Sequence, residues 1–437
     1  MATRISQKKE GLNPNAENKP KKKKRITRHT NNDLPDEILH HIFSFLPFKP
    51  LAQTTVLSKN WNHLPLWRSH PHLDFSNLSP NAIELVPTLL SRRQPHSNIT
   101  AFRLSGCVSS SCLRDCIDRV MKQGIEQLEL DVHFEDSFDL PSSLFSCDTL
   151  RVLTLNHQNK GQTENGARQA RQAFRGFTPF PSVHTLSLSN VRLNCGRDLF
   201  SGKNFPLLRK LGLKNCGGIS GLLIKCPGLE ILEIDRLRLS GLDISGIGLL
   251  ELRITKCFQY VNSWANILAP SLQSLYWEGK VSVKFTVESF RVLKTFSLWF
   301  YYKVPNRATW QSVSTLLSAI CFVRSMTFVG SGSRVLETLS KIDSEGGLPC
   351  SFNNLITLEL HPRMTKDEIT GIICLLRSSP ILRTITITAN SCSHPGNEKW
   401  NEKQYWISQI QKLKSIEFQL KVARSNVCGS KMHKSAV

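Results

Sequence analysis

Residues 208–257 read LRKLGLKNCGGISGLLIKCPGLEILEIDRLRLSGLDISGIGLLELRITKC and contain three copies of one short pattern. Apolar residues occupy the first, fourth and sixth places of each copy: LRKLGL from Leu208, LEILEI from Leu229 and LLELRI from Leu249. The alternation at the end of the pattern predicts a short β-strand with one buried face. Because the copies begin 20 or 21 residues apart, we expect the chain to repeat one structural unit.

The same pattern extends over most of the chain. Thirteen segments follow it at intervals of 20 to 33 residues, and they begin at Ile99, Ile125, Leu150, Val183, Leu208, Leu229, Leu249, Leu272, Leu293, Val323, Leu355, Leu382 and Leu413. The pattern resembles irregular leucine-rich repeats, in which each unit gives one strand to a curved parallel sheet and returns along the convex side as helix or loop. A doubly wound α/β domain is the alternative, but a single open sheet of thirteen strands would be unusually wide. The sequence therefore favours an α/β solenoid over residues 99–422.

Two further details support this strand register. A small polar residue follows the last strand position by three places in four units, at Cys107, Cys216, Cys257 and Asn390. A buried donor at this place can satisfy carbonyl groups of the turn that leaves the strand. Proline, which suits the turn that leads into a strand, stands two residues before five segments, at Pro181, Pro206, Pro227, Pro270 and Pro380.

A helical block precedes the repeats. Residues 32–67 read NDLPDEILHHIFSFLPFKPLAQTTVLSKNWNHLPLW. Pro35 suits the first turn of a helix, and the acidic residues Asp36 and Glu37 suit the positive end of its dipole. The apolar residues that follow cover more than one helical stripe, and about forty residues cannot enclose so much apolar surface alone. The block is therefore either a small cap on the repeats or a docking module for another protein.

The block resembles the F-box of plant F-box proteins. The resemblance rests on LPDEIL at 34–39, Leu46 followed by Pro47, LSK at 57–59 and Trp61, while Asn60 departs from the family's usual basic residue. It implies docking on a Skp-type adaptor, which joins a cullin and a RING subunit to form a ubiquitin ligase. The residues that would contact the adaptor are Leu34, Pro35, Ile38, Leu39, Ile42, Leu46, Val56, Leu57 and Trp61.

The net charge of +22 is unevenly distributed. Residues 1–30 hold ten basic and two acidic side chains, net +8, with few bulky apolar groups, and we expect a disordered tail. Its run KPKKKKR resembles a nuclear localisation signal that binds an import receptor, and the cations concerned are Lys21, Lys22, Lys23, Lys24 and Arg25. A solvated basic tail is the alternative. The remaining charge of +14 is spread over the rest of the chain, which indicates a basic surface and not a focused phosphate track.

Composition and cysteine usage place the chain among ordinary globular proteins of a reducing compartment. Hydrophobic residues make up 40% and charged residues 21%, and thirteen cysteines lack paired spacing. We see no apolar signal segment and no run long enough to span a membrane, so we expect a protein of the nucleus, with the cytoplasm as a second location. The expected organisation is a basic tail (1–30), an F-box (31–72), a connector (73–98), the solenoid (99–422) and a C-terminal tail (423–437). Residues 348–390 within the solenoid weakly resemble the FBD segment of plant F-box/LRR proteins.

No pattern in the sequence indicates catalysis, a cofactor or a metal. The stretch Gly330-Ser-Gly332-Ser-Arg334 lacks the Lys-Ser/Thr of a phosphate-binding loop. Cys107, Cys112 and Cys116 lie close together in sequence but lack the two-residue spacing of a zinc site. We therefore expect function to reside in binding surfaces.

Strand alternation predicts which side chains face outward from the sheet. In the central units the outward set includes Lys210, Lys214, Arg253, Tyr276 and Trp299, a mixture of cationic and aromatic side chains typical of protein-binding surfaces. Scattered exposed residues without a partner are the alternative. A long basic return at 156–178, which carries Lys160, Arg168, Arg171 and Arg175, is either a second contact surface or a tolerated insertion.

These observations together predict a non-catalytic target-recognition subunit of an SCF-type ubiquitin ligase. In this hypothesis the F-box binds the adaptor, and the repeats bind an unidentified target protein. The alternatives are a nuclear interaction scaffold without a ligase role and a basic nucleic-acid-binding protein.

Overall fold

A computed structural model describes the solenoid and a few positions of the preceding block. The described residues are 35, 38, 41–43, 45, 46, 50, 51, 53, 68 and 70–423, except 77, 94–96, 135–137, 159–173, 176–179, 194, 195, 259, 261, 280–282, 301–306, 330–333, 345, 363, 364 and 391–416. The basic run at 21–25 and the loop residues Lys160, Arg168 and Arg171 lie outside this part of the chain.

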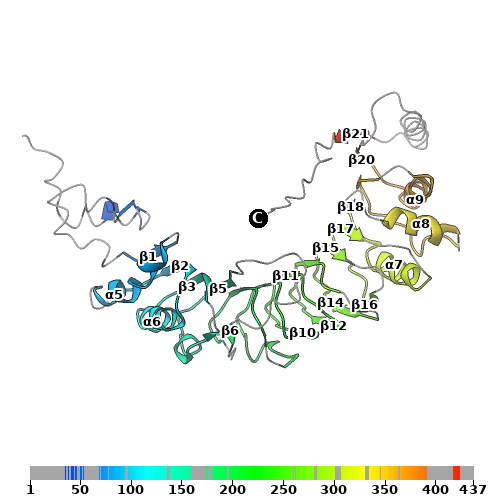
Figure 1. The fold of residues 1–437 in the computed structure, drawn as a ribbon. Coiled ribbons are helices and arrows are strands. Elements are labelled where there is room, and N and C mark those ends of the chain that lie inside the picture. Colours follow the sequence, from blue (N-terminus) through cyan, green and yellow to red (C-terminus); the bar gives the residue numbers. More distant parts are fainter. Residues whose placement is uncertain are drawn as a thin grey trace, which may run out of the picture.

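One long parallel sheet organises the molecule and lines the inner side of an arc (Figure 1). The described chain gives it fourteen strands in nearly sequential order. They are β1 (His72–Phe75), β2 (Ala101–Cys107), β3 (Gln127–His133), β5 (Val152–His157), β7 (Thr185–Ser189), β9 (Lys210–Lys214), β11 (Ile231–Asp235), β13 (Glu251–Thr255), β15 (Ser274–Gly279), β17 (Thr295–Phe300), β18 (Ser325–Phe328), β19 (Thr357–Leu360), β20 (Thr384–Asn390) and β21 (Glu417–Ala423).

The thirteen expected strands are all present, each within or just after its segment. The sheet begins one strand earlier than predicted, because β1 lies in the segment that we expected to be a connector. The residues 348–390 that weakly resemble an FBD segment contribute β19, β20 and an intervening helix, and they continue the same sheet.

Helices cover the outer side of the sheet towards its two ends (Figure 1). They are α4 (Pro80–Ile83), α5 (Val86–Ser91), α6 (Ser110–Met121), the 3-10 helix η3 (Ser142–Leu144), α7 (Arg307–Ala319), α8 (Val335–Ser344) and α9 (Lys366–Arg377). Helix α9 begins with a capping box, since the Thr365 hydroxyl accepts from the Glu368 N–H and the Glu368 carboxylate accepts from the Thr365 N–H.

In the centre, the outer layer is a second parallel sheet. It consists of β8 (Phe200–Ser201), β10 (Gly221–Lys225), β12 (Gly241–Ser245), β14 (Trp264–Leu268) and β16 (Lys284–Val287). A short pair, β4 (Phe138–Asp139) with β6 (Phe174–Arg175), lies outside both sheets. We expected helices or loops here. Central units of only 20 to 25 residues must accommodate a strand and two turns, and too few residues remain for a helix of average length.

The core lies between the two layers. Along each central strand the second and fourth residues are buried, as in the pairs Leu211 and Leu213 of β9 and Leu232 and Ile234 of β11. The parallel register places these pairs directly beside one another. Each unit thus buries its apolar face against its neighbours, and truncation of one such leucine to alanine would cost about 2–5 kcal/mol.

Candidate functional site

The turn that leaves each central strand is built from a repeated set of hydrogen bonds. The buried Cys257 Sγ donates to the carbonyl groups of Ile234 (3.3 Å) and Thr255 (3.1 Å), and Cys216 Sγ donates likewise to Leu188 (3.4 Å). Both cysteines therefore do what the repeat pattern predicts at this place. Burial raises the pKa of each thiol to about 12, so both remain neutral donors at physiological pH.

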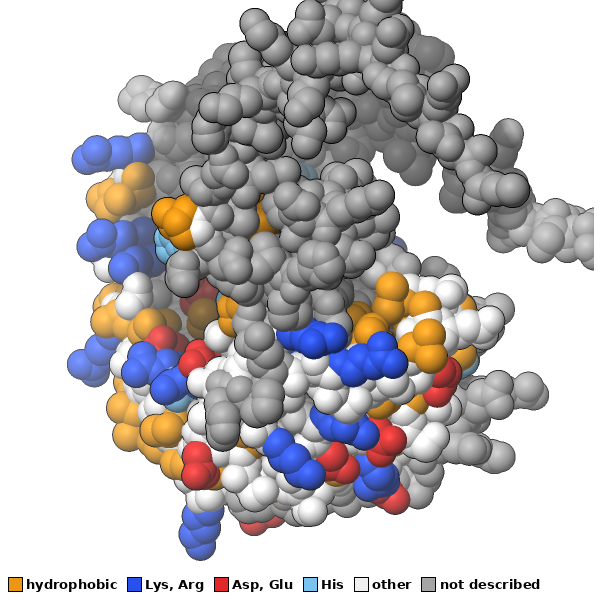
Figure 2. Space-filling view, turned by 90° about the vertical axis from the view of Figure 1, so that its left-hand side faces the viewer, with side chains coloured by type: hydrophobic (Ala, Val, Ile, Leu, Met, Phe, Trp, Pro, Cys, Tyr) orange, Lys and Arg blue, Asp and Glu red, His pale blue; other side chains and the backbone are white. Residues whose placement is uncertain are grey.

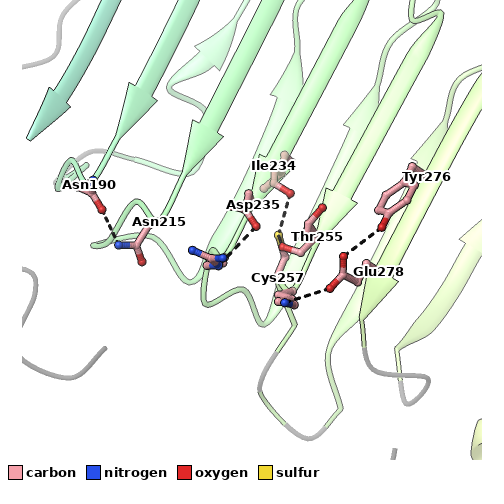
Figure 3. A network of polar contacts seen from close by, with 10 residues as sticks. Asn190, Asn215, Ile234, Asp235, Thr255, Cys257, Tyr276 and Glu278 are labelled. Carbon is pink, nitrogen blue, oxygen red and sulfur yellow. Dashed lines mark hydrogen bonds and ion pairs between the residues drawn. The ribbon is translucent and has the colours of Figure 1, made fainter. Parts of the chain in front are cut away.

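The residue immediately after each central strand lies in the left-handed backbone region, with φ between 51° and 56° at Asn190, Asn215, Arg236 and Lys256. Their backbone N–H groups donate to a carbonyl at the end of the next strand, as from Arg236 to Thr255 and from Lys256 to Glu278 (both 2.8 Å). The Asn215 side chain also donates to Asn190 (2.6 Å), which Figure 3 shows. The sequence analysis did not identify this row, although residues at one fixed offset after each strand could have indicated it.

The expected target-binding residues lie together on the concave face of β9 to β17. Lys210 and Lys214 of β9, Arg253 of β13, Tyr276 of β15 and Trp299 of β17 occupy the outward-facing positions of their strands. Tyr276 and Trp299 are not direct cross-strand partners, however. Tyr276 lies opposite Ser297, and Trp299 lies opposite Glu278.

Each of the two aromatic side chains is contacted by a cation. The Arg253 guanidinium carbon lies 3.8 Å from the centre of the Tyr276 ring, and the Lys256 Nζ lies 5.7 Å from the centre of the Trp299 indole. The Tyr276 hydroxyl donates to Glu278 Oε2 (3.1 Å), and the Lys256 Nζ lies 3.3 Å from Glu278 Oε1 (Figure 3). Strand alternation places Glu278 on this face together with Tyr276 and Arg253, but its burial and its contacts with Tyr276 and Lys256 were not predicted. Burial raises the pKa of the Tyr276 phenol, which keeps it a neutral donor.

The described part of the helical block presents an apolar face to solvent. Ile38 and Ile42 are each 46% exposed, and Phe45 is 75% exposed. Residues three or four places apart lie on one helical face, so these three side chains form a stripe, which we call the F-box stripe. Phe43 and Leu51 are buried. Among the predicted adaptor contacts, Pro35 is also exposed and Leu46 is half-buried, whereas Leu34, Leu39, Val56, Leu57 and Trp61 lie outside the described residues.

The end of this block is attached to the first strands of the solenoid. His70, which is buried, lies with Nε2 3.0 Å from the Leu46 carbonyl oxygen and with Nδ1 2.6 Å from the His72 carbonyl oxygen. Burial lowers the pKa of His70, which favours the neutral ring. Arg93 then donates to the His70 carbonyl group (3.0 Å). Side-chain and backbone contacts therefore fix the helical block to the repeats.

The charges on the N-terminal end of the molecule are mixed. Figure 2 shows Lys and Arg side chains interspersed with Asp and Glu on this face, without a continuous basic field. On the neighbouring strands β2 and β3, Arg103 pairs with Glu129 (3.6 Å). The described side chains of this face therefore do not form the uniform positive surface on which phosphate-backbone binding depends.

The described residues include no group of three His, Cys, Asp or Glu side chains placed to hold a metal ion. Cys112 and Cys116 are buried on α6, and a hydrogen bond with Cys112 together with burial raises the pKa of Cys116. Within the same part of the chain, no helix combines the length and the apolar character that crossing a membrane requires.

Comparison with known proteins agrees with this architecture. The F-box domain model matches residues 32–69. An F-box/FBD/LRR-repeat protein of Arabidopsis thaliana is 30% identical over 412 residues, which cover 88% of this chain and 80% of the relative. A second Arabidopsis thaliana relative, an F-box/LRR-repeat protein, is 25% identical over 81% of this chain and 90% of its own length. The F-box/LRR-repeat protein 25 of the same plant is 32% identical over 47% of this chain and 75% of its own length. With an F-box at residues 32–69, a solenoid of parallel strands after it and a relative that matches across both, the chain belongs to the F-box/LRR-repeat family.

Proposed function

We propose that this protein is the target-binding subunit of an SCF-type cullin-RING ubiquitin ligase. Its F-box would dock on a Skp-type adaptor, and its concave sheet would hold the target protein. The single observation that carries the proposal is the F-box stripe of Ile38, Ile42 and Phe45, which exposes apolar surface within the residues that the F-box model matches. Exposed contiguous apolar side chains on a soluble domain are typical of a protein-binding surface.

The proposed mechanism is positioning. The adaptor would connect the chain to the cullin and the RING subunit, and the repeats would hold a lysine of the target near the ubiquitin-loaded enzyme. Such a bridge raises the effective concentration of the reacting groups and requires no catalytic residue from this chain. The contact between His70 and Leu46 supports this role, because it attaches the F-box to the sheet that would carry the target.

Co-purification tests the proposal. The tagged chain, expressed in plant cells, is expected to recover a Skp-type adaptor and a cullin, which mass spectrometry identifies. A variant with Ile38→Asp and Ile42→Asp should lose both proteins, and so should one with Leu34→Ala and Pro35→Ala. Ile247→Asp is the matched control, because Ile247 is 73% exposed but lies in the solenoid. Recovery of adaptor by the stripe variant at the level of the control would refute the assignment.

We further propose that the basic run at residues 21–25 directs nuclear import. Several consecutive cations, Lys21 to Lys24 and Arg25, would bind the acidic groove of an import receptor. Replacement of all five by neutral residues is expected to move a fluorescently tagged protein from the nucleus to the cytoplasm. An equal nuclear signal from both proteins would leave the run as a solvated tail.

A further inference from the structure

A groove of about 450 Å³ lies on the concave face over β7 to β15. Its lining includes three small residues, Ser187 and Ser189 of β7 and Gly212 of β9. Its walls carry seven charged side chains, which are Lys214, Glu233, Asp235, Arg236, Arg253, Lys256 and Glu278. An extended peptide segment of another protein could lie in this groove, and the charges of the groove indicate which side chains that segment would carry.

The acidic side chains of the groove already have cationic partners. The pairs are Glu233 with Lys210 (3.9 Å), Asp235 with Arg236 (3.9 Å) and Glu278 with Lys256 (3.3 Å). By contrast, Lys214 and Arg253 have no carboxylate within ion-pair distance in the part of the chain that the structure describes. These two cations stand on the strands that flank β11, directly opposite Asp235 and Glu233 in the register, but neither forms an ion pair with its opposite carboxylate among the described residues.

Contacts with neighbouring side chains orient the Arg253 guanidinium. Its guanidinium lies on the face of Tyr276, whose hydroxyl donates to Glu278, and the Glu278 side chain is only 7% exposed. A face contact of this kind leaves the N–H groups at the edge of the guanidinium free to donate. Because an arginine fork matches the two oxygens of a carboxylate, Arg253 is presented in a form suited to bind one.

Two of these charged residues, Arg236 and Lys256, share an unusual backbone conformation. Arg236 and Lys256 hold the left-handed position that Asn190 and Asn215 occupy in the preceding units. Apart from glycine, asparagine and aspartate, few residues adopt this conformation. At Arg236 it is stabilised by the backbone N–H, which donates to the Thr255 carbonyl (2.8 Å). The sequence thus changes from amides to cations where the row reaches the groove, and these two cations pair with Asp235 and Glu278.

We infer that this groove binds an acidic peptide segment of the target protein, with Arg253 and Lys214 each taking a carboxylate. The inference rests on the proposed function, which it deepens by naming the class of target segment. Lys214 and Arg253 are two strand spacings apart across the sheet and two residues apart along the strands, or about 12 Å in all. An extended chain advances about 3.3 Å per residue, so the two acidic residues of the target would stand two to four positions apart.

Selection from a displayed library of random linear peptides tests the inference with the full-length chain. The wild-type protein is expected to enrich peptides with two Asp or Glu residues two to four positions apart. An Arg253→Glu variant should lose these peptides and enrich peptides with Lys or Arg instead. Arg103→Gln is the matched control, because Arg103 occupies the same row of the sheet on β2, where it pairs with Glu129. It should select the same peptides as the wild type.

Synthetic versions of the selected peptides then give affinities by fluorescence anisotropy. We expect Arg253→Gln to weaken binding roughly 10- to 100-fold, as loss of a charge-assisted contact does. Tyr276→Leu should weaken it as well, whereas Tyr276→Phe, which keeps the ring face under Arg253, should retain most of it. This difference separates positioning by the ring from a general structural effect. Gly212→Val should also block binding, because it adds a side chain to the lining of the groove.

The remaining outcomes are equally decisive. Failure to select any peptide, selection without acidic enrichment, or equal binding by the Arg253 variants would overturn the inference. If only phosphoserine versions of the peptides bind, the groove recognises phosphate and the carboxylate assignment falls. Adaptor binding is measured separately on the same protein. If the protein binds the adaptor but no acidic peptide, this inference is refuted. If it binds acidic peptides but no adaptor, the proposed function is refuted.

Discussion

The Arg253 guanidinium lies 3.8 Å from the centre of the Tyr276 ring, across the adjacent strands β13 and β15. The next residue, Trp277, points the opposite way and is fully buried against Phe258 (5.4 Å between ring centres). One step along a strand thus separates a side chain of the binding face from one of the largest side chains in the core.

This alternation predicts very different costs for two neighbouring substitutions. Trp277→Ala should lower the free energy of unfolding by about 3–5 kcal/mol, because it leaves a large cavity. Tyr276→Ala should lower it by about 1 kcal/mol, since it removes a half-exposed ring and one hydrogen bond. Urea unfolding of both variants measures the difference. Equal costs would show that the assigned strand register is wrong.

The contact between α8 and α9 depends on the absence of a side chain at Gly371. A Cβ at this position would overlap the carbonyl group of Leu336 on α8. Gly371→Ala should therefore force the helices apart and cost about 1–3 kcal/mol. Gly212→Ala is the control, because a Cβ there would lie 3.5 Å from its nearest neighbour, the Ser187 hydroxyl, and should change stability by less than about 0.5 kcal/mol. Equal effects in thermal unfolding would contradict this packing.

The attachment of the F-box to the solenoid should weaken in mild acid. Burial holds the pKa of His70 below its ordinary value of 6.5, so the folded state favours the neutral ring. The stability that neutral His70 contributes is therefore complete above pH 6.5 and is lost as the pH falls through the lower folded pKa. His70→Gln keeps a donor that can reach the Leu46 carbonyl but does not titrate. Urea unfolding at pH 7.5 and pH 5.5 measures the decrease in the free energy of unfolding between the two pH values. This decrease should be smaller for the variant than for the wild type, and equal decreases would argue against the role of His70.

The stability contributed by the Cys257 thiol, just after β13, should decrease at alkaline pH, whereas that of His70 decreases in acid. The pKa of Cys257 is raised from 9.0 to about 12 by burial, so its contribution is complete below pH 9 and declines as the pH rises towards 12. In the folded protein at pH 8.5, Cys257 should resist iodoacetamide, and it should react once urea unfolds the chain. Peptide mass spectrometry identifies the modified residue. Rapid native alkylation of Cys257 would mean that this turn is open.

The sequence predicted the long sheet well, because its information is local and periodic. The apolar places in segments such as LRKLGL determine which face of each strand is buried, and Cys216 and Cys257 confirm the register through hydrogen bonds to carbonyl groups of the turns. The outer sheet was not anticipated. Its strands are five residues or shorter, and stretches such as Gly221–Lys225 begin with a glycine, which is usual in turns.

The sequence predicted where the candidate site lies, but it did not predict how the side chains of the site contact one another. Alternation alone placed Arg253 and Tyr276 on one face, but their stacking depends on which residues the parallel register brings opposite each other. The support from Glu278 depends on burial, which the sequence of β15 does not reveal. Similarly, the contact between His70 and Leu46 joins residues 24 positions apart, and no local pattern indicates it.

The central claim is that the F-box stripe binds a Skp-type adaptor, and isothermal titration calorimetry of the two purified proteins tests it most directly. The account predicts that the wild-type chain forms a complex with the adaptor. It also predicts that Ile38→Asp with Ile42→Asp weakens this complex at least about 100-fold, as expected for central apolar contacts. Unfolding of the variant should remain near wild type, because both side chains are 46% exposed. Absence of a wild-type complex, or equal affinity of the folded variant, would contradict the account.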